Sequence, residues 1–478
     1  MKITAAFDPV TRIEGHLNIT IDIDTVNGVR QVVDAKAIGG LFRGFEKILI
    51  GRDPRDAQHI TERICGVCPV AHGMAAVKNL DAAFGVTIPD NALIMRNLVN
   101  GSNFVESHIL HFYLLSAPDF IEGPAMPPWQ ADWAIDRRFS KAESDALLGH
   151  YVQALTVRRK ADQMTAIFGG KVPHPPAYIA GGFTCTPRQE RIDLFNSFLD
   201  ELIPFIQNTY IPDVELLAAR YPDYFTLGRG YGNLLAFGVF DQSTNPASPN
   251  RLLAQGHAVN GSRTVQSLNI NQITEHVTHS WFQNGTALNP ASGISIPQSP
   301  KDGAYTWLKA PRYNNLPYEV GPLARMWVNG DYQKGVSTMD RHLSRAYECL
   351  KIAQAMRGWV NNLDPAGAVY NEPTLPQTAT AYGLTEAPRG ALGHWLGITA
   401  GKLSRYQVIS PTTWNCAPRD DAGLPGPIEQ ALLGTPVENP NQPIEVMRII
   451  HSFDPCLDCA THIIVPGKDA KIFRMGAC

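Results

Sequence analysis

The 478 residues of this chain are 44% hydrophobic, enough apolar material for a large buried core. Its 41 basic and 44 acidic residues give a formal net charge of −3 at pH 7, without the basic stripe that a nucleic acid backbone requires. No window approaches the roughly 18 apolar residues of a membrane span, and residues 1–12 lack the pattern of a secretory signal. Nucleic acid and a direct membrane span are therefore excluded, and the chain alone is expected in the cytoplasm.

The N-terminal segment predicts strands. Residues 1–40 alternate apolar and polar side chains, and Asn27-Gly28 separates two alternating runs as a turn. We expect a β-hairpin or small sheet here, inside a β-rich segment that covers residues 1–60.

Helical periodicity dominates the rest of the chain. Apolar residues recur at helical spacing over four long ranges, which predicts helices at 91–115, 143–169, 187–219 and 337–363. Two segments rich in Pro, Gly, Asn, Ser or Ala, 241–330 and 364–380, predict irregular or short-stranded structure. The expected fold class is α+β, a central bundle of long helices with small marginal β-sheets. Residues 1–478 are expected to form a single interlocked unit.

Two Cys-x-x-Cys pairs lie near opposite ends of the chain, Cys65 with Cys68 and Cys456 with Cys459. A structural zinc site usually draws both pairs from one short segment, with about 12–20 residues between them. Thiolates from two distant segments indicate instead a buried site with soft sulfur ligands for a redox metal. Zinc and iron–sulfur ligation also fit four thiolates, so the ligand chemistry alone leaves the metal open.

Read with their flanks, these segments resemble the large subunit of nickel–iron hydrogenases. Six motifs carry the resemblance in the family's order: residues 12–16 (RIEGH), 42–46 (FRGFE), 63–69 (RICGVCP), 321–326 (GPLARM), 386–390 (EAPRG) and 454–459 (DPCLDC). The sequence of residues 39–56 is most similar to those of the respiratory uptake group and its selenium-containing relatives.

The resemblance implies a Ni-Fe(CN)2(CO) centre. Cys65, Cys68, Cys456 and Cys459 would bind nickel, and Cys68 and Cys459 would also bridge to iron. The selenium-containing relatives carry selenocysteine at the position of Cys456, so sulfur chemistry is expected here. The implied reaction is the reversible cleavage of H2 into protons and electrons.

Three residues receive catalytic roles from the resemblance. Cys456 is the expected first base for the proton, and Glu14 the proton gate behind it. Arg389, placed by Pro388, is expected over the open metal position, where a fixed guanidinium donates to a cyanide ligand. Taken alone, Glu14 would be a surface or capping carboxylate and Arg389 a solvated side chain.

Four further residues are expected around the centre. Thr412 matches a donor to the second cyanide, and His72 is expected to donate a hydrogen bond to the bridging sulfur. Many family members have aspartate at the position of Ser107, whereas the selenium-containing relatives also have serine there; Asp454 remains as the other carboxylate beside Arg389. Without the resemblance, His72 is a satisfied core histidine and Thr412 a loop residue.

The resemblance also implies a magnesium site and a processed C-terminus. Glu46, the backbone carbonyl of Val408 and His462 match the family's Mg2+ ligands, a plausible set for a hard cation. Mature members end at the histidine that matches His462, so residues 463–478 are expected to be a cleavable extension. The alternative interpretation of this tail is an ordinary terminal strand with Cys478 as a spare thiol.

The expected partners follow from the same resemblance. The four remaining cysteines, Cys185, Cys349, Cys416 and Cys478, lack the spacing of a relay of iron–sulfur clusters, so electrons must leave through an iron–sulfur small subunit. A maturation endopeptidase and metal-insertion chaperones would act on the precursor in the cytoplasm, and the small subunit would bring the enzyme to the periplasm or the membrane. Alternative functions are a hydrogen sensor, a metal-free quinone-reductase-like electron-transfer subunit and a structural zinc protein.

Overall fold

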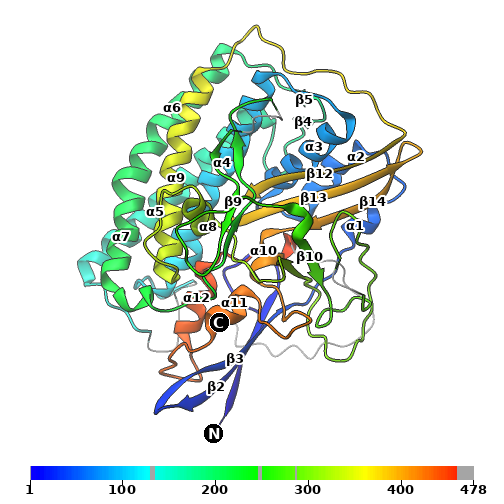
Figure 1. Cartoon of the computed structure of the whole chain (residues 1–478). Helices are drawn as coiled ribbons and strands as arrows, with labels where there is room; N and C mark the ends of the chain where they lie inside the picture. The colour runs from blue at the N-terminus through cyan, green and yellow to red at the C-terminus, as the bar shows by residue number, and fades with distance from the viewer. Residues whose placement is uncertain (1, 127, 130–134, 246–249, 286–287, 460–478) are drawn as a thin grey trace.

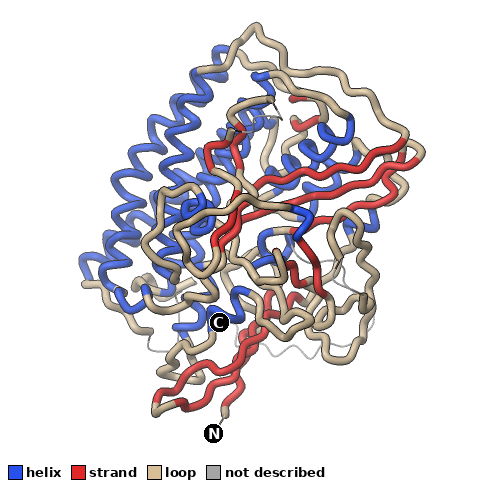
Figure 2. Tube along the Cα trace, in the orientation of Figure 1, coloured by secondary structure: helices blue, strands red, loops and turns tan. Residues whose placement is uncertain are grey.

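The computed structural model of the chain describes residues 2–126, 128–129, 135–245, 250–285 and 288–459, with Cys459 described by its backbone alone. Long helices line one side of the molecule, and small antiparallel sheets lie beside and below them (Figures 1 and 2). The predicted α+β class is confirmed. Among the described residues, no helix combines the length and apolar character needed to cross a membrane.

The N-terminal sheet has three antiparallel strands in chain order: β1 (Ile3–Phe7), β2 (Leu17–Val26) and β3 (Val29–Gly39). Asn27 and Gly28 form the predicted turn with φ of 52° and 81°. Alternate residues of β2 face inward and join one core cluster with residues of α11 (Pro427–Leu432) and α12 (Ile444–Ser452). The hairpin is confirmed, and its inner face lies against the C-terminal region of the chain.

All four predicted long helices are present: α4 (Asp90–Leu110), α5 (Lys141–Gly169), α6 (Gln189–Phe205) continuing into α7 (Ile211–Arg220), and α9 (Thr338–Asn361). They pack side by side, α4 against α5 and α9, and α6 against α5 and α9 (Figure 1). Ser140 and Glu143 form a capping box that starts α5. The bundle supplies the main hydrophobic core.

Two π-helical segments interrupt this bundle, at Ile206–Tyr210 between α6 and α7 and at His111–Ser116 after α4. The segment Ile206–Tyr210 lies between Pro204 and Pro212. Proline lacks the N–H that in an α-helix bonds to the carbonyl four residues earlier. The wider π turn accommodates this missing bond within a continuous helical path.

A second three-stranded sheet, β12 (Thr378–Ala387), β13 (Gly390–Thr399) and β14 (Lys402–Ile409), lies against α3 (Pro69–Phe84). Its central strand β13 is buried on both faces except at its last residue. A strand of this kind shows no apolar–polar alternation, which is why the sequence did not predict it. Within the segment predicted as irregular, 364–377 holds no named helix or strand and β12 begins at Thr378.

Short elements complete the described chain. Two brief helices precede the first cysteine pair, α1 (Phe45–Ile48) and α2 (Asp56–Thr61). Short strands pair two by two in and just before the segment predicted to be short-stranded, 241–330: β6 (Leu234–Ala236) with β9 (Gly256–Ala258), β7 (Val239–Asp241) with β8 (Arg251–Leu253), and β10 (Ile273–His276) with β11 (Ala310–Tyr313). The same segment also contains a helix that was not predicted, α8 (Pro322–Val328). The strand pair β4 (Tyr178–Ile179) and β5 (Gly182–Phe183) lies upstream, and the helix α10 (Pro411–Asn415) lies downstream.

Candidate metal centre

Two loops from opposite ends of the chain form the candidate centre. Cys65 follows a 3-10 turn, and Cys68 immediately precedes α3, whose first residue is Pro69. Cys456 pairs with Glu14 in an isolated parallel bridge, where the N–H of Leu457 donates to the carbonyl of Glu14 at 2.7 Å. This bridge brings the N-terminal segment and the C-terminal loop to the same place.

The sulfurs of Cys65, Cys68 and Cys456 converge. All three Sγ atoms lie within 4.8 Å of one another, and all three residues are buried. The Sγ atoms of Cys65 and Cys456 are 3.3 Å apart, well beyond the roughly 2.05 Å of a disulfide bond. Three buried thiols at this separation form a soft donor set suited to a transition metal. The side chain of Cys459 lies outside the described residues.

Backbone N–H groups also point at the cluster. The N–H groups of Val67 and Cys68 both donate to Sγ of Cys65 at 3.3 Å, as expected where a thiolate is to be stabilised. Thr412, in α10, accepts the N–H of Cys456 at 2.9 Å through its hydroxyl oxygen. This contact positions Cys456 and leaves the hydroxyl proton of Thr412 available for donation.

Arg389 lies beside the thiols, and some of its N–H donors have no partner in the described chain. It occupies the turn between β12 and β13, and only 2% of its side chain is exposed. Its Nη2 is 3.1 Å from Oδ1 of Asp454, whereas Nε and Nη1 have no partner in the described part of the chain. Burial would lower the pKa of Arg389, but Asp454 and the three cysteines hold it well above its usual value. A charged, buried guanidinium with unused N–H groups fits a centre that bears hydrogen-bond acceptors.

Glu14 lies beside the first cysteine loop. An ideal Cβ built on Gly66 would be 4.0 Å from Oε1 of Glu14, so the carboxylate reaches the loop between Cys65 and Cys68. Burial, with added repulsion from Cys65 and Asp458, raises the pKa of Glu14 to about 7, although Arg389 opposes the shift. A carboxyl group with this pKa can take up and release a proton near neutral pH.

His72 continues into a buried chain of polar groups. Its Nδ1 is 3.2 Å from Nε2 of His394, and Nδ1 of His394 is 2.9 Å from the hydroxyl oxygen of Tyr406. Burial, reinforced by His72, holds the pKa of His394 well below its usual value, so this ring is neutral. Sequence reasoning missed His394 and Tyr406 because both lie on strands it did not predict.

Ser107 is buried on α4, and its hydroxyl has no hydrogen-bond partner among the described side chains and backbone. The neighbouring Glu106 forms an ion pair with Arg158 of α5. Within the described chain, the only carboxylate ion-paired with Arg389 is therefore Asp454.

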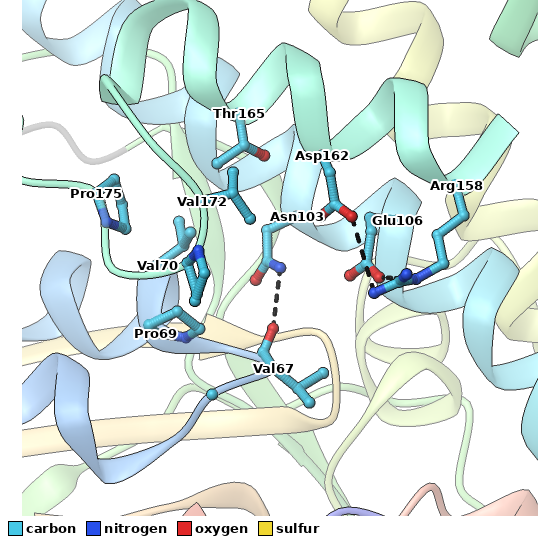
Figure 3. A pocket seen from close by; sticks show the side chains of 12 residues that line it. Val67, Pro69, Val70, Asn103, Glu106, Arg158, Asp162, Thr165, Val172 and Pro175 are labelled. Atoms are coloured by element: carbon cyan, nitrogen blue, oxygen red, sulfur yellow. Dashed lines mark hydrogen bonds and ion pairs between the residues drawn. The ribbon is translucent and has the colours of Figure 1, made fainter. Parts of the chain in front are cut away.

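A cavity of about 330 Å³ lies on the outer side of the first cysteine loop (Figure 3). Gly66 and Val67 of the first cysteine loop line it, and Asn103 donates to the carbonyl of Val67 at 3.2 Å. Arg158 and Asp162 of α5, both partly exposed, line it as well, together with the buried Glu106. The space could hold roughly ten water molecules and connects charged side chains near the surface with the loop.

The residues predicted to bind magnesium form a second buried polar group. Oε1 of Glu46 accepts the N–H of Val408 at 3.0 Å and lies 3.5 Å from Nζ of Lys309. Lys309 also binds Glu275 at 2.8 Å and Oε1 of Gln407 at 3.2 Å. Glu46 and Val408 are thus neighbours as expected, while His462 lies outside the described residues. Lys309 and Glu275 carry no sequence motif and were not predicted.

Comparisons with known proteins agree with this geometry. The chain matches the family described as nickel-dependent hydrogenase over residues 43–132 and 130–462, and a HoxL-like family over residues 4–33. It is similar to the periplasmic [NiFeSe] hydrogenase large subunit of Desulfomicrobium baculatum, with 40% identity over 97% of this chain and 95% of that one. The uptake hydrogenase large subunit of Rhizobium leguminosarum bv. viciae is 34% identical over 96% of this chain and 95% of its own. The solved Ni-Fe-Se hydrogenase from D. vulgaris Hildenborough superposes with a TM-score of 0.92 at 40% identity, covering 97% of this chain and 100% of the other.

Proposed function

The chain belongs to the large subunits of nickel-dependent hydrogenases, and we propose that it cleaves H2 reversibly at a Ni-Fe(CN)2(CO) centre. As a member of this family it is an oxidoreductase that acts on H2. One observation carries the proposal for the centre: three buried thiols within 4.8 Å of one another, beside an arginine with two nitrogens that lack partners in the described chain. Cys459 would complete the set of four thiolates.

The cysteines would hold the metals. Cys65, Cys68, Cys456 and Cys459 would bind nickel, with Cys68 and Cys459 shared with iron. When bound, the centre supplies a Lewis acid that polarises H2. Burial of the described thiols keeps water away from them, which strengthens every electrostatic interaction at the site.

Proton transfer would run from Cys456 to Glu14. The thiolate of Cys456 takes the first proton, and Glu14, with a pKa of about 7, passes it on. The Glu14→Gln variant keeps the size of the side chain but cannot carry a proton. We expect it to keep its nickel content and to lose roughly 10²- to 10⁴-fold in the rate of H2 oxidation. Unchanged turnover in this variant would remove Glu14 from the pathway.

The residues around the thiols would orient this chemistry. Arg389, set by Pro388 and paired with Asp454, would donate to a cyanide ligand, and Thr412 would donate to the second cyanide while it holds the N–H of Cys456. His72 would donate to a bridging sulfur from α3. Ser107 would leave more room beside Arg389 than a carboxylate would.

A magnesium ion would be bound by Glu46, the carbonyl of Val408 and His462. The adjacency of Glu46 and Val408, both of which carry hard oxygen donors, supports a site for such a cation. Magnesium in the purified enzyme, at one equivalent per chain and lost in Glu46→Gln, is the expected result.

Residues 463–478 would be a removable C-terminal extension of a single folded unit. The family match ends at His462, and residues 463–478 would be removed by a maturation endopeptidase after metal-insertion chaperones have acted. Residues 1–478 would fold as one interlocked unit, because the β-rich segment of residues 1–60 shares a core with α11 and α12. An intact mass that includes residues 463–478 in fully active enzyme would contradict the processing.

An iron–sulfur small subunit would carry the electrons away. The relatives of this chain are named large subunits, so a second subunit is expected. The periplasmic name of the Desulfomicrobium baculatum relative supports a periplasmic or membrane-associated location reached through that partner.

Infrared spectroscopy and metal analysis of the purified heterodimer test the central proposal. Bands from iron-bound carbon monoxide and cyanide, one nickel per chain and H2-dependent dye reduction are the expected results. Zinc alone in a chain that ends at His462, without these bands, would contradict the catalytic function. Bands with very low turnover would point instead to a hydrogen sensor.

A further inference from the structure

Arg325 is the only charged residue of α8, and its side chain is completely buried. A buried guanidinium is costly unless its N–H groups find partners, because it leaves water without compensation. The role proposed for the centre gives no function to this arginine or to the motif at residues 321–326 that contains it.

Each of the five N–H donors of Arg325 has a partner. Nε and Nη2 bind the two carboxylate oxygens of Glu348 at 2.5 and 2.8 Å, and Nη1 binds Oε2 of Glu386 at 2.9 Å. The two remaining donors reach backbone carbonyls, of Ala387 at 3.0 Å and of Pro388 at 2.7 Å. No donor remains for any other group, so the whole hydrogen-bonding capacity of Arg325 is used on these residues.

Both carbonyls belong to the turn that carries Arg389. Ala387 pairs with Gly390 across β12 and β13, so Pro388 and Arg389 are the two residues of the hairpin turn. The turn also lies tightly against the chain that leads into α8. A Cβ added to Gly390, whose φ is +139°, would be 2.5 Å from Val320, and one added to Gly321 would be 3.1 Å from the carbonyl oxygen of Arg389.

Arg325, Glu348 and Glu386 together form a clamp on this turn, and its two carboxylates are themselves anchored. His108 of α4 contacts Glu348 of α9 at 3.1 Å, and the N–H of Phe237 donates to Glu386 at 2.6 Å. Burial opposes the charge on Glu348, but Arg325 lowers the pKa of Glu348 to about 2, so this carboxylate stays ionised. The clamp therefore ties the turn to the three helices α4, α8 and α9.

By contrast, the side chain of Arg389 has few contacts of its own. Its ion pair with Asp454 leaves Nε and Nη1 without partners in the described chain. The direction of its guanidinium therefore depends on the backbone from which it projects.

We propose that Arg325 is a positioning residue for Arg389: by gripping the carbonyls of Ala387 and Pro388, it fixes the turn from which Arg389 reaches the thiol centre. The inference rests on the proposed function, because it matters only if Arg389 acts on a ligand of the metals. Arg325 does not touch the centre itself. It acts through the turn.

The test compares Arg325→Lys with Arg312→Lys in the heterodimer. Lysine keeps the charge but loses the planar fork that reaches two carboxylates and two carbonyls at once. Arg312 is a matched control, because it is equally buried and binds Asp420 and three backbone carbonyls, none of them in the centre. The readouts are metal content, the infrared frequencies of the cyanide bands and the rate of H2 oxidation.

We expect Arg325→Lys to keep its nickel, to shift the cyanide bands and to lose roughly 10- to 100-fold in rate, as misplacement of a catalytic group does. Arg312→Lys should leave the bands unmoved. Unmoved bands and an unchanged rate in a fully loaded Arg325→Lys enzyme would overturn the inference. Absence of the bands from the unaltered heterodimer would instead overturn the proposed function.

If Arg325→Lys does not accumulate as folded protein, the Glu386→Gln variant tests the positioning role of Arg325 instead. It keeps an oxygen that can accept the N–H of Phe237, but it replaces the oxygen that accepts Nη1 of Arg325 by an amide nitrogen, which cannot accept. A smaller shift of the same cyanide bands supports the positioning role, and unmoved bands contradict it.

Discussion

The thiol centre and the group around Lys309 are both buried and polar, yet they differ in how many of their hydrogen-bonding and charged groups have partners within the described chain. Lys309 binds Glu275, Glu46, Ser295 and Gln407, so its charge is compensated from within the chain. At the thiol centre, two nitrogens of Arg389 have no partner among the described residues, and three thiols face one another. The protein thus leaves hydrogen-bond donors without protein partners at one buried site while it satisfies the lysine at another, and the first site is where the nickel–iron centre would fit.

The largest effect is expected from a change to the thiol centre. Cys65→Ser replaces a soft ligand by a hard one, so nickel content and H2 oxidation should both fall to background. Cys416→Ser is the matched control, because Cys416 is equally buried but packs in the core cluster beneath the N-terminal sheet. Metal analysis and a dye-reduction assay measure the two results. Loss of nickel in both variants would show that the thiols act through stability alone.

The next effect concerns the unpartnered donors. Arg389→Lys keeps the charge but loses the planar set of N–H groups, and we expect roughly a 100-fold loss of turnover with nickel retained. Arg357→Lys, at a partly exposed ion pair with Asp200, should change turnover less than about twofold. Equal rates for Arg389→Lys and the unaltered enzyme would mean that the open donors have no role.

A change at Lys309 should affect stability rather than nickel content. Lys309→Met leaves Glu275 buried without its cation, which we expect to cost about 3–5 kcal/mol of unfolding free energy. Urea denaturation measures this cost, and nickel analysis should give an unchanged value. A variant that loses nickel while keeping its stability would show that the two sites are not distinct in this way.

The smallest effect depends on pH and lies away from both sites. Glu429 accepts hydrogen bonds from the N–H of Ala37 and the hydroxyl of Tyr305, and burial raises the pKa of Glu429 to about 7. A raised carboxyl pKa means that the folded chain binds the proton more tightly than the unfolded chain. The stabilisation is therefore complete below the unfolded pKa of about 4.5 and disappears as the pH rises through about 7.

Glu429→Gln should remove this dependence. Between pH 5 and pH 8 the unaltered protein should lose up to about 3 kcal/mol of unfolding free energy relative to the variant. Urea midpoints at the two pH values give the comparison. A constant difference between the two proteins would show that Glu429 keeps an ordinary pKa.

Local patterns in the sequence predicted the elements that depend on a regular period. The four long helices and the β2–β3 hairpin follow from apolar spacing and from the Asn27-Gly28 turn. Strand β13 could not be predicted in this way, because burial on both faces removes the alternation. The two π-helical segments were not predicted either, because each covers only five or six residues, too few for their wider turn to show as a separate period.

Some residues of the candidate site could be predicted from the sequence, and others could not. Cys65, Cys68 and Cys456 were predicted from spacing and flanking residues, and the structure brings them together. Lys309, His394 and the contacts of Arg325 were not, because each depends on partners far away in the sequence. The period of a sequence reports the local path of the chain, whereas a buried ion pair is a product of the assembled fold.

The bridge between Glu14 and Cys456 has a consequence for biosynthesis. Synthesis proceeds from the N-terminus at about 5–20 residues per second, so Glu14 leaves the ribosome long before Cys456 exists. The segment around Glu14 therefore has no bridge partner until almost the whole chain has been synthesised. Contacts between residues this distant in sequence also form slowly, because closing so large a loop costs chain entropy. The centre is therefore among the last regions of the molecule to form, because the bridge between Glu14 and Cys456 cannot exist while the chain is still being synthesised.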